Sequence, residues 1–308
     1  MGGRVGARAG ARLRVSGKDA RRLWFGLLTV LGLAERGFFI PHRYAGRRPR
    51  AGARPPYPAA EALFAGREAE FRAVLARLER RGDDLLRIGA EAEAPRPRWG
   101  QSWFPRLDAA TAYALVRDHA PGRIVEVGSG HSTRFYAQAV ADGGFECRIL
   151  AIDPAPRAAL SGLPVELRRA SLQEVLQARS TSPFEALGPG DLLSIDSSHI
   201  LLPGSDVDML LGRVLPALPP GVLIQIHDIF LPDDYPASWD WRGYGEQLAV
   251  LPILLGGRVE VMFSSRYVVT RMASDFEASV AARLPLGPGD DGEVFESSLW
   301  LRWRGAAN

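Results

Sequence analysis

The chain has 308 residues, 46% of them hydrophobic, and a formal net charge of +3 at pH 7. A chain of this length can bury one large core, and an α/β domain often exceeds about 200 residues without dividing. The lone Cys147 excludes an internal disulfide and a cysteine-based metal site, so we expect a protein of the reducing cytoplasm rather than a secreted, disulfide-held fold.

Positive charge is concentrated at the N-terminus. Residues 1–58 contain 13 Arg or Lys against two acids, a balance of +11, which leaves −8 for the remainder of a chain whose total is +3. A basic arm on an acidic body can bind nucleic acid or an anionic membrane surface. Arg is scattered throughout the chain, however, and the basic residues are not interleaved with aromatic ones as in RNA-binding motifs. We therefore expect no nucleic-acid partner.

An apolar stretch, residues 23–34, follows the basic start. It is shorter than the roughly 20 residues that span a bilayer. A basic segment before a short apolar run resembles a signal peptide, but no small-residue cleavage site follows it. We expect an amphipathic helix that packs on the body, covers the active site or joins two copies in a homo-oligomer. Peripheral membrane contact through residues 1–45 is the alternative.

Residues 47–58 are rich in Pro and Arg and predict an extended linker. From Ala59 to Ile88, apolar residues recur every three to four positions, which predicts a long amphipathic helix with a break near Gly82. A helix is also expected over Asp108–His119, with Asp108 as its candidate N-cap.

We divide the chain into two parts. Residues 1–100 form a basic N-terminal extension with amphipathic helices and a Pro/Arg-rich linker, and residues 101–308 form the main domain. From Arg123 onward, apolar strand-like runs alternate with helical patterns, which is typical of parallel βαβ units. The pattern predicts the α/β class, with a Rossmann-like, doubly wound sheet of seven mostly parallel strands, an antiparallel strand near its end and an N-terminal helical extension. The expected strands are 123–127, 148–152, 165–168, 191–195, 222–227, 259–263 and 298–303.

A glycine turn follows the first expected strand. Gly128 and Gly130 permit close approach of a ligand, and the N–H groups of the helix that follows favour an anionic or strongly polar one. Thr133 stands where the dinucleotide fingerprint has its third glycine, which argues against NAD and FAD. The second strand ends in Asp153, about twenty residues further on, where an acid can accept hydrogen bonds from both ribose hydroxyls.

The turn and the acid together resemble the class I S-adenosylmethionine-dependent methyltransferases, whose first motif has the form E-x-G-x-G and whose second strand ends in an acid. The resemblance implies that Glu126 orients the methionine end of the cofactor and that Asp153 binds its ribose. Ser171 falls where the family contacts adenine, in place of the more usual Asp. The cofactor-binding residues implied in this way are Glu126, Gly128, Ser129, Gly130, Ser132, Asp153 and Ser171.

Two further strand ends carry ionisable residues. The fourth strand ends in Asp196, with His199 just beyond, and the fifth ends in His227 and Asp228. Because ligands of open α/β sheets bind at the carboxyl ends of the strands, we expect these side chains to converge beside the cofactor. Two carboxylates with imidazole can hold Mg²⁺, Mn²⁺ or Fe²⁺.

The pattern I-D-x-x-H, followed by a strand that ends in an acidic pair, is similar to the macrocin-type and related small-molecule O-methyltransferases over roughly residues 105–270. The resemblance implies that Asp196 and Asp228 hold a divalent cation, with His227 as a third candidate ligand where the family has an acid. It implies His199 as the general base, with Asp196 beside it in the catalytic site. A hydroxyl is a poor nucleophile, so a base near neutral pKa suits its methylation.

These features predict an O-methyltransferase acting on a small hydroxylated molecule. A non-catalytic or membrane-associated S-adenosylmethionine-binding module is the alternative. Methylation of nucleic-acid bases fits less well, because the fourth strand lacks an N/D-P-P-Y/F motif. Residues 230–241 follow the fifth strand, and loops in that place carry specificity. Their acids and aromatics form either an acceptor pocket or ordinary loop packing, and the residues concerned are Asp233, Asp234, Tyr235, Trp239 and Trp241.

Overall fold

The computed structural model describes residues 17–178, 182–289 and 293–305, and it contains two compact units that divide between Pro49 and Arg50. The described part of the first unit contains helix α1 (Gly17–Val30) and the short helix η1 (Ala45–Arg47). None of its described side chains is buried. Within the described ranges, no helix is both long and apolar enough to cross a membrane.

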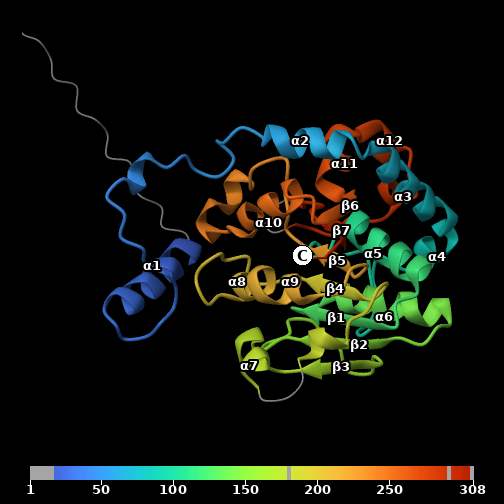
Figure 1. Ribbon diagram of the computed structural model, residues 1–308, viewed down its shortest axis with the longest axis horizontal. Helices are drawn as coiled ribbons and strands as arrows, with labels where there is room; N and C mark the ends of the chain where they lie inside the picture. The colour runs from blue at the N-terminus through green and yellow to red at the C-terminus, as the bar shows by residue number, and fades with distance from the viewer. Residues whose placement is uncertain (1–16, 179–181, 290–292, 306–308) are drawn as a thin grey trace, which may run out of the picture. The chain divides into compact units, whose positions relative to one another are not determined.

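A seven-stranded sheet forms the centre of the second unit (Figure 1). Its order is β3-β2-β1-β4-β5-β7-β6, in which β7 runs antiparallel to both neighbours and the other pairs are parallel. The Rossmann-like, doubly wound sheet expected from the sequence is therefore confirmed. The strands are β1 (Arg123–Val127), β2 (Arg148–Ile152), β3 (Val165–Arg168), β4 (Leu192–Ile195), β5 (Leu223–Ile226), β6 (Val259–Ser264) and β7 (Leu299–Trp303).

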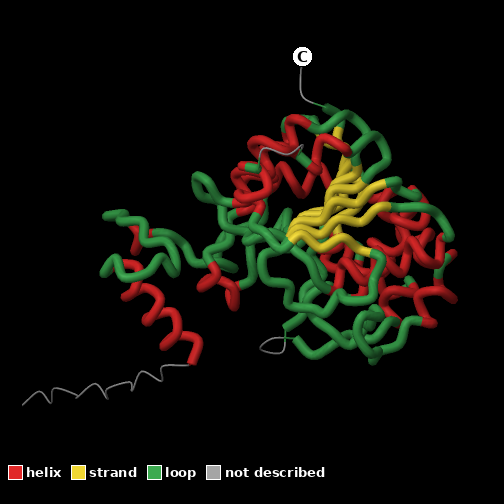
Figure 2. The backbone as a smooth tube through the Cα atoms, turned by 90° about the horizontal axis from the view of Figure 1, so that it is seen from below, coloured by secondary structure: helices red, strands yellow, loops and turns green. Residues whose placement is uncertain are grey.

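The central strands are apolar because both of their faces are covered. Every residue of β4 and β5 is buried, as expected for parallel strands with helices on both sides. Figure 2 shows helices on the two sides of the sheet. The larger ones are α5 (Arg106–His119), α6 (His131–Gly143), α7 (Leu172–Gln177), α10 (Glu246–Leu255) and α11 (Ser265–Arg271). Shorter segments are η2 (Pro183–Ala186), α8 (Asp206–Met209), η3 (Leu210–Val214), α9 (Leu215–Ala217), η4 (Ala237–Arg242), α12 (Ala273–Glu277) and α13 (Val280–Arg283).

The helical pattern before the sheet is divided into three helices, α2 (Pro58–Ala65), α3 (Glu68–Arg80) and α4 (Gly82–Arg87). The expected break at Gly82 is confirmed, and a second break at Gly66 was not expected. The apolar faces join the main core: Phe71 lies 5.7 Å from Phe263 and Phe64 lies 5.7 Å from Tyr267, measured between ring centroids. These helices therefore pack with the sheet, although they precede residue 101.

The expectation that Asp108 caps α5 is wrong. The helix begins two residues earlier, at Arg106, and Pro105 occupies the N-cap position. Asp108 is wholly buried in the first turn, where it accepts hydrogen bonds from the backbone N–H groups of Ser297 and Ser298 at 2.9 and 3.0 Å. A buried carboxylate requires such donors. Asp108 thus fastens α5 to the segment that enters β7.

Candidate active site

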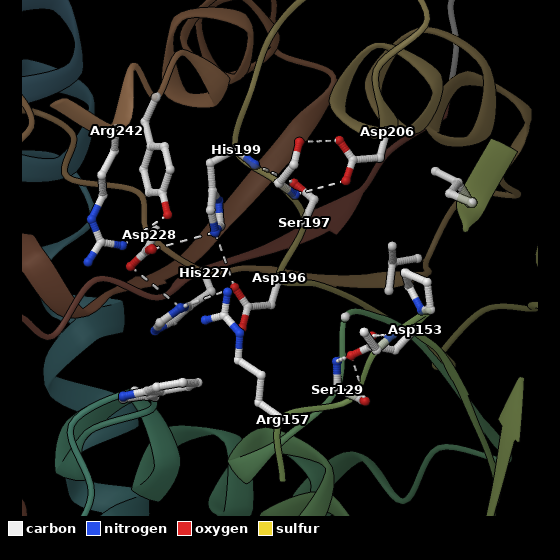
Figure 3. A pocket seen from close by; sticks show the side chains of 18 of the residues that line it. Ser129, Asp153, Arg157, Asp196, Ser197, His199, Asp206, His227, Asp228 and Arg242 are labelled. Carbon is white, nitrogen blue, oxygen red and sulfur yellow. Dashed lines mark hydrogen bonds and ion pairs between the residues drawn. The ribbon is translucent and has the colours of Figure 1, made fainter. Parts of the chain in front are cut away.

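A pocket of about 540 Å³ lies at the carboxyl ends of β1, β2, β4 and β5 (Figure 3). Ser129 and Asp153 lie at one end of it, and His199, His227 and Asp228 at the other. The pocket therefore brings the two predicted groups of residues into one space. Of the predicted residues, it is lined by Gly128, Ser129, Asp153, Ser171, Asp196, His199, His227 and Asp228.

Gly128 is required by the close approach of two strand ends. Its φ is 83°, a conformation that favours glycine, and a Cβ added there would lie 2.1 Å from the carbonyl oxygen of Asp196. The N–H of Gly128 donates to Ile152, and that of Asp196 donates to Val127, both at 3.0 Å or less. The turn is thus fixed against β2 on one side and against the end of β4 on the other.

Asp153 organises the turn from the end of β2. Its Oδ2 accepts hydrogen bonds from the N–H and the hydroxyl of Ser129, at 2.9 and 2.8 Å, and its Oδ1 accepts one from the N–H of Ala155. Ser171 caps α7 and is held by Glu174. Both side chains face the pocket while serving as local anchors.

Glu126 lies behind the turn. It is wholly buried and accepts hydrogen bonds from the hydroxyls of Ser132 and Thr133, each at 2.5 Å. Burial raises its pKa to about 8, although the two hydroxyls oppose this shift. Neither Glu126 nor Ser132 lines the pocket, and Gly130 lines a neighbouring one. In the structure, Glu126 fastens the first turn of α6 to β1.

His199 is held by a glutamate that the sequence analysis did not identify. Its Nδ1 lies 2.8 Å from Oε2 of Glu246, the wholly buried first residue of α10. Its Nε2 faces Asp196 at 3.2 Å and Asp228 at 3.5 Å. Burial alone would lower the pKa of His199, but the contacts with Asp196 and Glu246 and the charge of Asp228 raise it well above its usual value.

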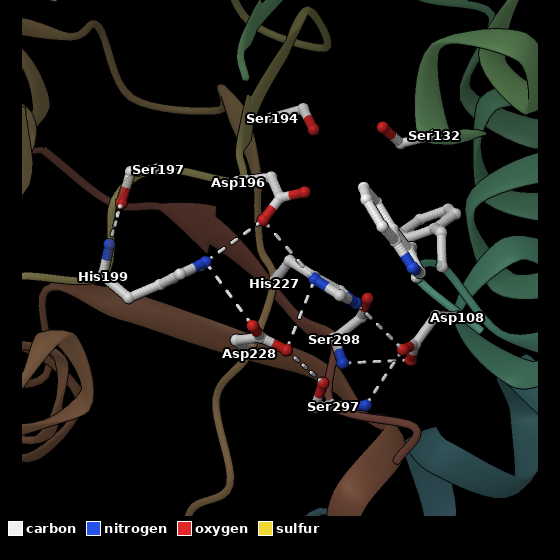
Figure 4. Close-up of polar contacts among 12 residues, drawn as sticks. Asp108, Ser132, Ser194, Asp196, Ser197, His199, His227, Asp228, Ser297 and Ser298 are labelled. Carbon is white, nitrogen blue, oxygen red and sulfur yellow. Dashed lines mark hydrogen bonds and ion pairs between the residues drawn. The ribbon is translucent and has the colours of Figure 1, made fainter. Parts of the chain in front are cut away.

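His227 continues the cluster towards α5 (Figure 4). Its Nδ1 lies 3.6 Å from Asp196 and 3.5 Å from Asp228, and its Nε2 lies 3.4 Å from Asp108. These are ion-pair distances, and neither ring nitrogen makes a hydrogen bond within the described residues. Burial by itself would lower the pKa of His227, but Asp228, Asp108 and Asp196 raise it well above the usual range.

The surroundings favour the positively charged form of both imidazoles. Four carboxylates, those of Asp108, Asp196, Asp228 and Glu246, surround them. Burial raises the pKa of Glu246 too, but the bond to His199 opposes that shift. Because acids outnumber the imidazoles, we assign the protons to the histidines. Desolvation would raise the pKa of Asp196, whose side chain remains 40% exposed, but both histidines hold it below the usual value.

The backbone is unusual at the same place. His199 and Asp228 have φ values of 60° and 57°, in the left-handed region that residues other than glycine seldom adopt. Among the described residues, Ala120 is the one other such case. Backbone conformations of this kind cost about 1–3 kcal/mol and gather at functional sites. Their coincidence with the buried ion cluster marks it as a candidate site of chemistry.

The cluster does not fit the metal site expected at Asp196, His227 and Asp228. In the part of the chain that the structure describes, no group of three or more His, Cys, Asp or Glu side chains is arranged to hold a metal ion. The carboxylates instead lie at ion-pair distances from the ring nitrogens of the two histidines, which favours the protonated rings, whereas a metal ligand must be a neutral imidazole. We therefore base no chemical step on a divalent cation.

The loop after β5, residues 230–241, is mostly engaged in packing. Trp239 lines the pocket, whereas Asp233 pairs with Arg266 and Arg271. Asp234 pairs with Arg54. Tyr235 is buried against Phe230, and Trp241 remains half exposed. The lining residues that the sequence analysis missed include Trp103, Arg157, Arg242 and Tyr244.

Comparison with known proteins bears on the central part of the chain. Residues 125–229, about a third of the chain, match the model of a family described as a methyltransferase domain. This segment extends from β1 to just beyond β5 and includes both groups of pocket residues. The match supports a methyltransferase domain at this place. A comparison with curated proteins finds no significant match.

Comparison with solved structures finds similarity at a low level. A Podospora anserina methyltransferase with bound S-adenosylhomocysteine (SAH) is 16% identical, with a TM-score of 0.40, and the alignment covers 96% of this chain and 100% of that one. An O-methyltransferase from Bacillus cereus in complex with SAH is 14% identical, with a TM-score of 0.35, and the alignment covers 75% of this chain and 91% of that one. A branched-chain polyamine synthase from Thermus thermophilus is 15% identical, with a TM-score of 0.39, and the alignment covers 92% of this chain and 79% of that one. At these scores we take no argument from the likeness.

Proposed function

We propose that this protein is an S-adenosylmethionine-dependent methyltransferase that methylates a hydroxyl group of a small molecule, with residues 101–308 as its catalytic domain and His199 as its base. The observation that carries the proposal is the single pocket that contains Asp153 at one end and His199 at the other. The family match over residues 125–229 supports the same class of reaction. Because of the single cysteine, we propose a cytoplasmic location.

The pocket suits a cationic cofactor. Among its described lining residues, five are acidic, namely Asp153, Asp196, Asp206, Asp228 and Glu293, against two arginines and the two histidines of the cluster. Asp153 is placed to bind a ribose, since it ends β2 beside the turn, and Gly128 leaves room for close backbone approach. When bound, S-adenosylmethionine supplies an electrophilic methyl group on a positively charged sulfur.

His199 is placed to move a proton. Its Nδ1 is fixed by Glu246, so Nε2 is the nitrogen that faces the pocket among Asp196 and Asp228. In its neutral form, Nε2 can accept the proton of a hydroxyl, and the surrounding carboxylates stabilise the imidazolium that results. Because the same carboxylates raise the pKa of His199, the neutral base forms only as the pH rises above the usual histidine range.

Calorimetry with SAH tests the cofactor assignment. We expect wild-type protein to bind SAH and the Asp153→Ala variant to bind it much more weakly. A wild-type protein that binds neither SAH nor S-adenosylmethionine would end the proposal.

For the base, release of SAH is measured with a panel of phenols and sugar alcohols. The His199→Gln variant is expected to retain SAH binding and to lose turnover, and full turnover would remove His199 from the reaction.

A membrane-associated cofactor-binding module is the second candidate, and one observation favours it. In the N-terminal unit, nine large apolar side chains are each at least 46% exposed, and residues 17–49 contain seven Arg or Lys against two acids. Exposed apolar groups beside basic ones suit an anionic lipid surface. The apolar residues are Leu23, Trp24, Leu27, Val30, Leu31, Leu33, Phe38, Phe39 and Ile40.

Vesicle sedimentation discriminates between the two candidates. The module requires binding to phosphatidylglycerol vesicles that is lost when residues 1–45 are deleted and when Trp24 and Leu27 are both changed to Ser. Neutral phosphatidylcholine vesicles are the control for charge. Equal sedimentation of the full chain and the deletion variant would remove the membrane candidate. Concentration-dependent dimerisation that the same deletion abolishes would instead assign the apolar side chains to a second copy of the chain.

A further inference from the structure

The loop after β5, residues 230–241, is bound to a segment far away in the sequence. That segment, residues 50–57, precedes α2, and we call it the strap. Three of its backbone N–H groups donate to acceptors on the loop. The pairs are Ala51 with Oδ1 of Asp240, Gly52 with Oδ2 of Asp234 and Tyr57 with the carbonyl of Pro232, at 2.8, 2.9 and 2.8 Å. The strap therefore follows the loop over most of its own length, although 182 positions separate Gly52 from Asp234.

An ion pair joins the strap to the loop at Arg54 and Asp234. Nε of Arg54 donates to Oδ2 of Asp234 at 2.8 Å, and Nη2 donates to Oδ1, so the two planar groups meet through two hydrogen bonds. Paired bonds of this kind fix direction as well as distance. The side chain of Asp234 is 3% exposed and that of Arg54 is 30% exposed, so water screens the pair only in part. Because a buried carboxylate requires donors, Asp234 holds the strap in place.

Close packing accompanies these polar contacts. Ala51 is buried in a small cluster, separate from the main core, with Phe230 and Tyr235. The partly buried side chains that pack against this cluster are Trp239, Tyr244 and Phe295. Gly52 has a φ of 77°, and a Cβ added there would lie 2.9 Å from both Cβ and the backbone N of Ala237. The strap and the loop are thus in direct backbone contact, with no space for a side chain at position 52.

The loop ends in η4, which forms part of the pocket wall. η4 carries Trp239 and Arg242, and both line the pocket. None of its residues is buried, so its position depends on the segments that contact it. The strap is one such segment. A second contains Glu293, which accepts a hydrogen bond from the hydroxyl of Ser238 at 2.5 Å.

η4 is connected to the proposed base through side chains. The guanidinium of Arg242 lies 4.2 Å from the ring centroid of Trp239, and its Nη1 donates to the hydroxyl of Tyr244 at 3.0 Å. The ring of Tyr244 in turn lies 4.6 Å from that of His199, measured between centroids. Figure 3 shows Arg242 towards His199 and away from Asp153. A displacement of η4 would therefore move the pocket wall beside His199 and leave the cofactor end in place.

We propose that the ion pair between Arg54 and Asp234 positions η4 and thereby sets the fit of the methyl acceptor beside His199. This inference rests on the proposed methyltransferase function. Neither Arg54 nor Asp234 is among the described residues that line the pocket. They are positioning residues for acceptor specificity, and they act through Trp239 and the wall that it forms.

The position of Trp239 is measured by fluorine NMR of protein containing 5-fluorotryptophan, which requires no acceptor. The chain has seven tryptophans, and the signal of Trp239 is assigned from its absence in Trp239→Phe. We expect Arg54→Gln and Asp234→Asn to shift this signal. The matched control is Arg67→Gln, because Arg67 pairs with Glu260 at similar exposure and lines neither pocket. An unshifted signal in both strap variants, or an equal shift in the control, would overturn the inference.

A steric variant tests the same contact without removing a charge. Gly52→Ala places a methyl group against Ala237, so we expect it to shift the signal of Trp239 as well. Gly144→Ala is its control, since Gly144 has a similar φ of 63° and nothing within 4 Å of an added Cβ. A signal of Trp239 that is the same in Gly52→Ala and the wild type would contradict the role of the strap.

Turnover separates positioning from a merely structural role. Arg54→Gln, Asp234→Asn and the double variant are compared on the phenols and sugar alcohols that the wild type methylates. We expect KM for the acceptor to rise about three- to tenfold, because part of the stabilisation from a charge-assisted hydrogen bond is lost from acceptor binding. We expect kcat and the affinity for SAH to stay unchanged. The double variant should resemble the single ones, since all three remove the same pair.

The outcomes distinguish the inference from the function on which it rests. A lower kcat with an unchanged KM would indicate loss of folded protein alone and refute a positioning role. An unchanged KM and an unchanged order of preference among acceptors would also refute it. If the wild type binds no SAH, the proposed function fails, and fluorine NMR still decides whether the strap positions η4.

Discussion

The Glu246→Gln substitution is the sharpest test of how the site controls the protonation of His199. Glutamine keeps the shape of the side chain and removes its charge. In the structure, the carboxylate lies 2.8 Å from Nδ1 of His199, and both groups are buried, so solvent does not screen the contact. The variant should therefore fold as the wild type does while losing stabilisation of the imidazolium.

The size of the effect follows from the contact. A hydrogen bond between charged groups contributes about 1.5–3 kcal/mol. One pKa unit corresponds to about 1.4 kcal/mol. Loss of the charge on Glu246 should therefore lower the pKa of His199 by about 1–2 units. The direction is downward because the removed carboxylate favours the protonated ring, and the wild-type pKa starts well above the usual value.

The assay is a pH titration of the imidazole resonances by NMR, which requires no acceptor. The chain has five histidines, and the signal of His199 is assigned from its absence in the His199→Gln variant. Glu293→Gln is the matched control, since Glu293 lines the same pocket and bonds Ser238 instead of His199. An unchanged or higher midpoint for His199 in Glu246→Gln would refute the reasoning, as would an equal shift in the control.

Three further predictions concern the cofactor side. Asp153→Ala should lower the affinity for SAH by about 10–100-fold in calorimetry, because it removes the proposed hydrogen bonds between the carboxylate and the ribose of SAH. Asp153→Asn should lower the affinity less. Gly128→Ala should destabilise the protein by about 3 kcal/mol in urea unfolding, since its Cβ would meet the carbonyl oxygen of Asp196. Gly190→Ala, with a similar φ of 88° and open space around it, should cost clearly less, and equal losses would exclude the clash. Glu126 has a pKa raised to about 8, so its contribution to stability is full below about pH 4.5 and is lost as the pH rises towards 8. In Glu126→Gln, the melting temperature should therefore change less with pH over that range than in the wild type. An equal pH dependence in both proteins would contradict the raised pKa of Glu126.

The sheet could be predicted from the sequence because its signals are local. Each parallel strand is a short apolar run, and the first three strands were predicted with the bounds that the structure has. The topology also fixes which strand ends meet at one edge. The convergence of Asp153, Asp196 and Asp228 in one pocket could therefore be inferred before any coordinates.

The partners of the ionisable residues could not be predicted in this way. Glu246 is separated from His199 by 47 positions, and Asp108 is 189 positions from Ser297, so no spacing connects them. A signal for Glu246 existed: it is an acid at the start of a helix that is apolar from Leu248 onward. Residue types alone also do not show whether an imidazole is charged, because its protonation depends on carboxylates contributed by distant elements.

The bond between His199 and Glu246 also affects how specificity can change. The loop between β5 and α10 runs from His227 to Gly245, and the N–H groups of Gly245 and Glu246 both donate to the carbonyl of His199. Its two ends are thus anchored on the ion cluster, and its middle part, which includes Trp239, lies between them. Substitutions in the middle can reshape the pocket beside Trp239 while the contact between His199 and Glu246 stays in place. Under the proposed function, such a chain could acquire new acceptors without rebuilding its base.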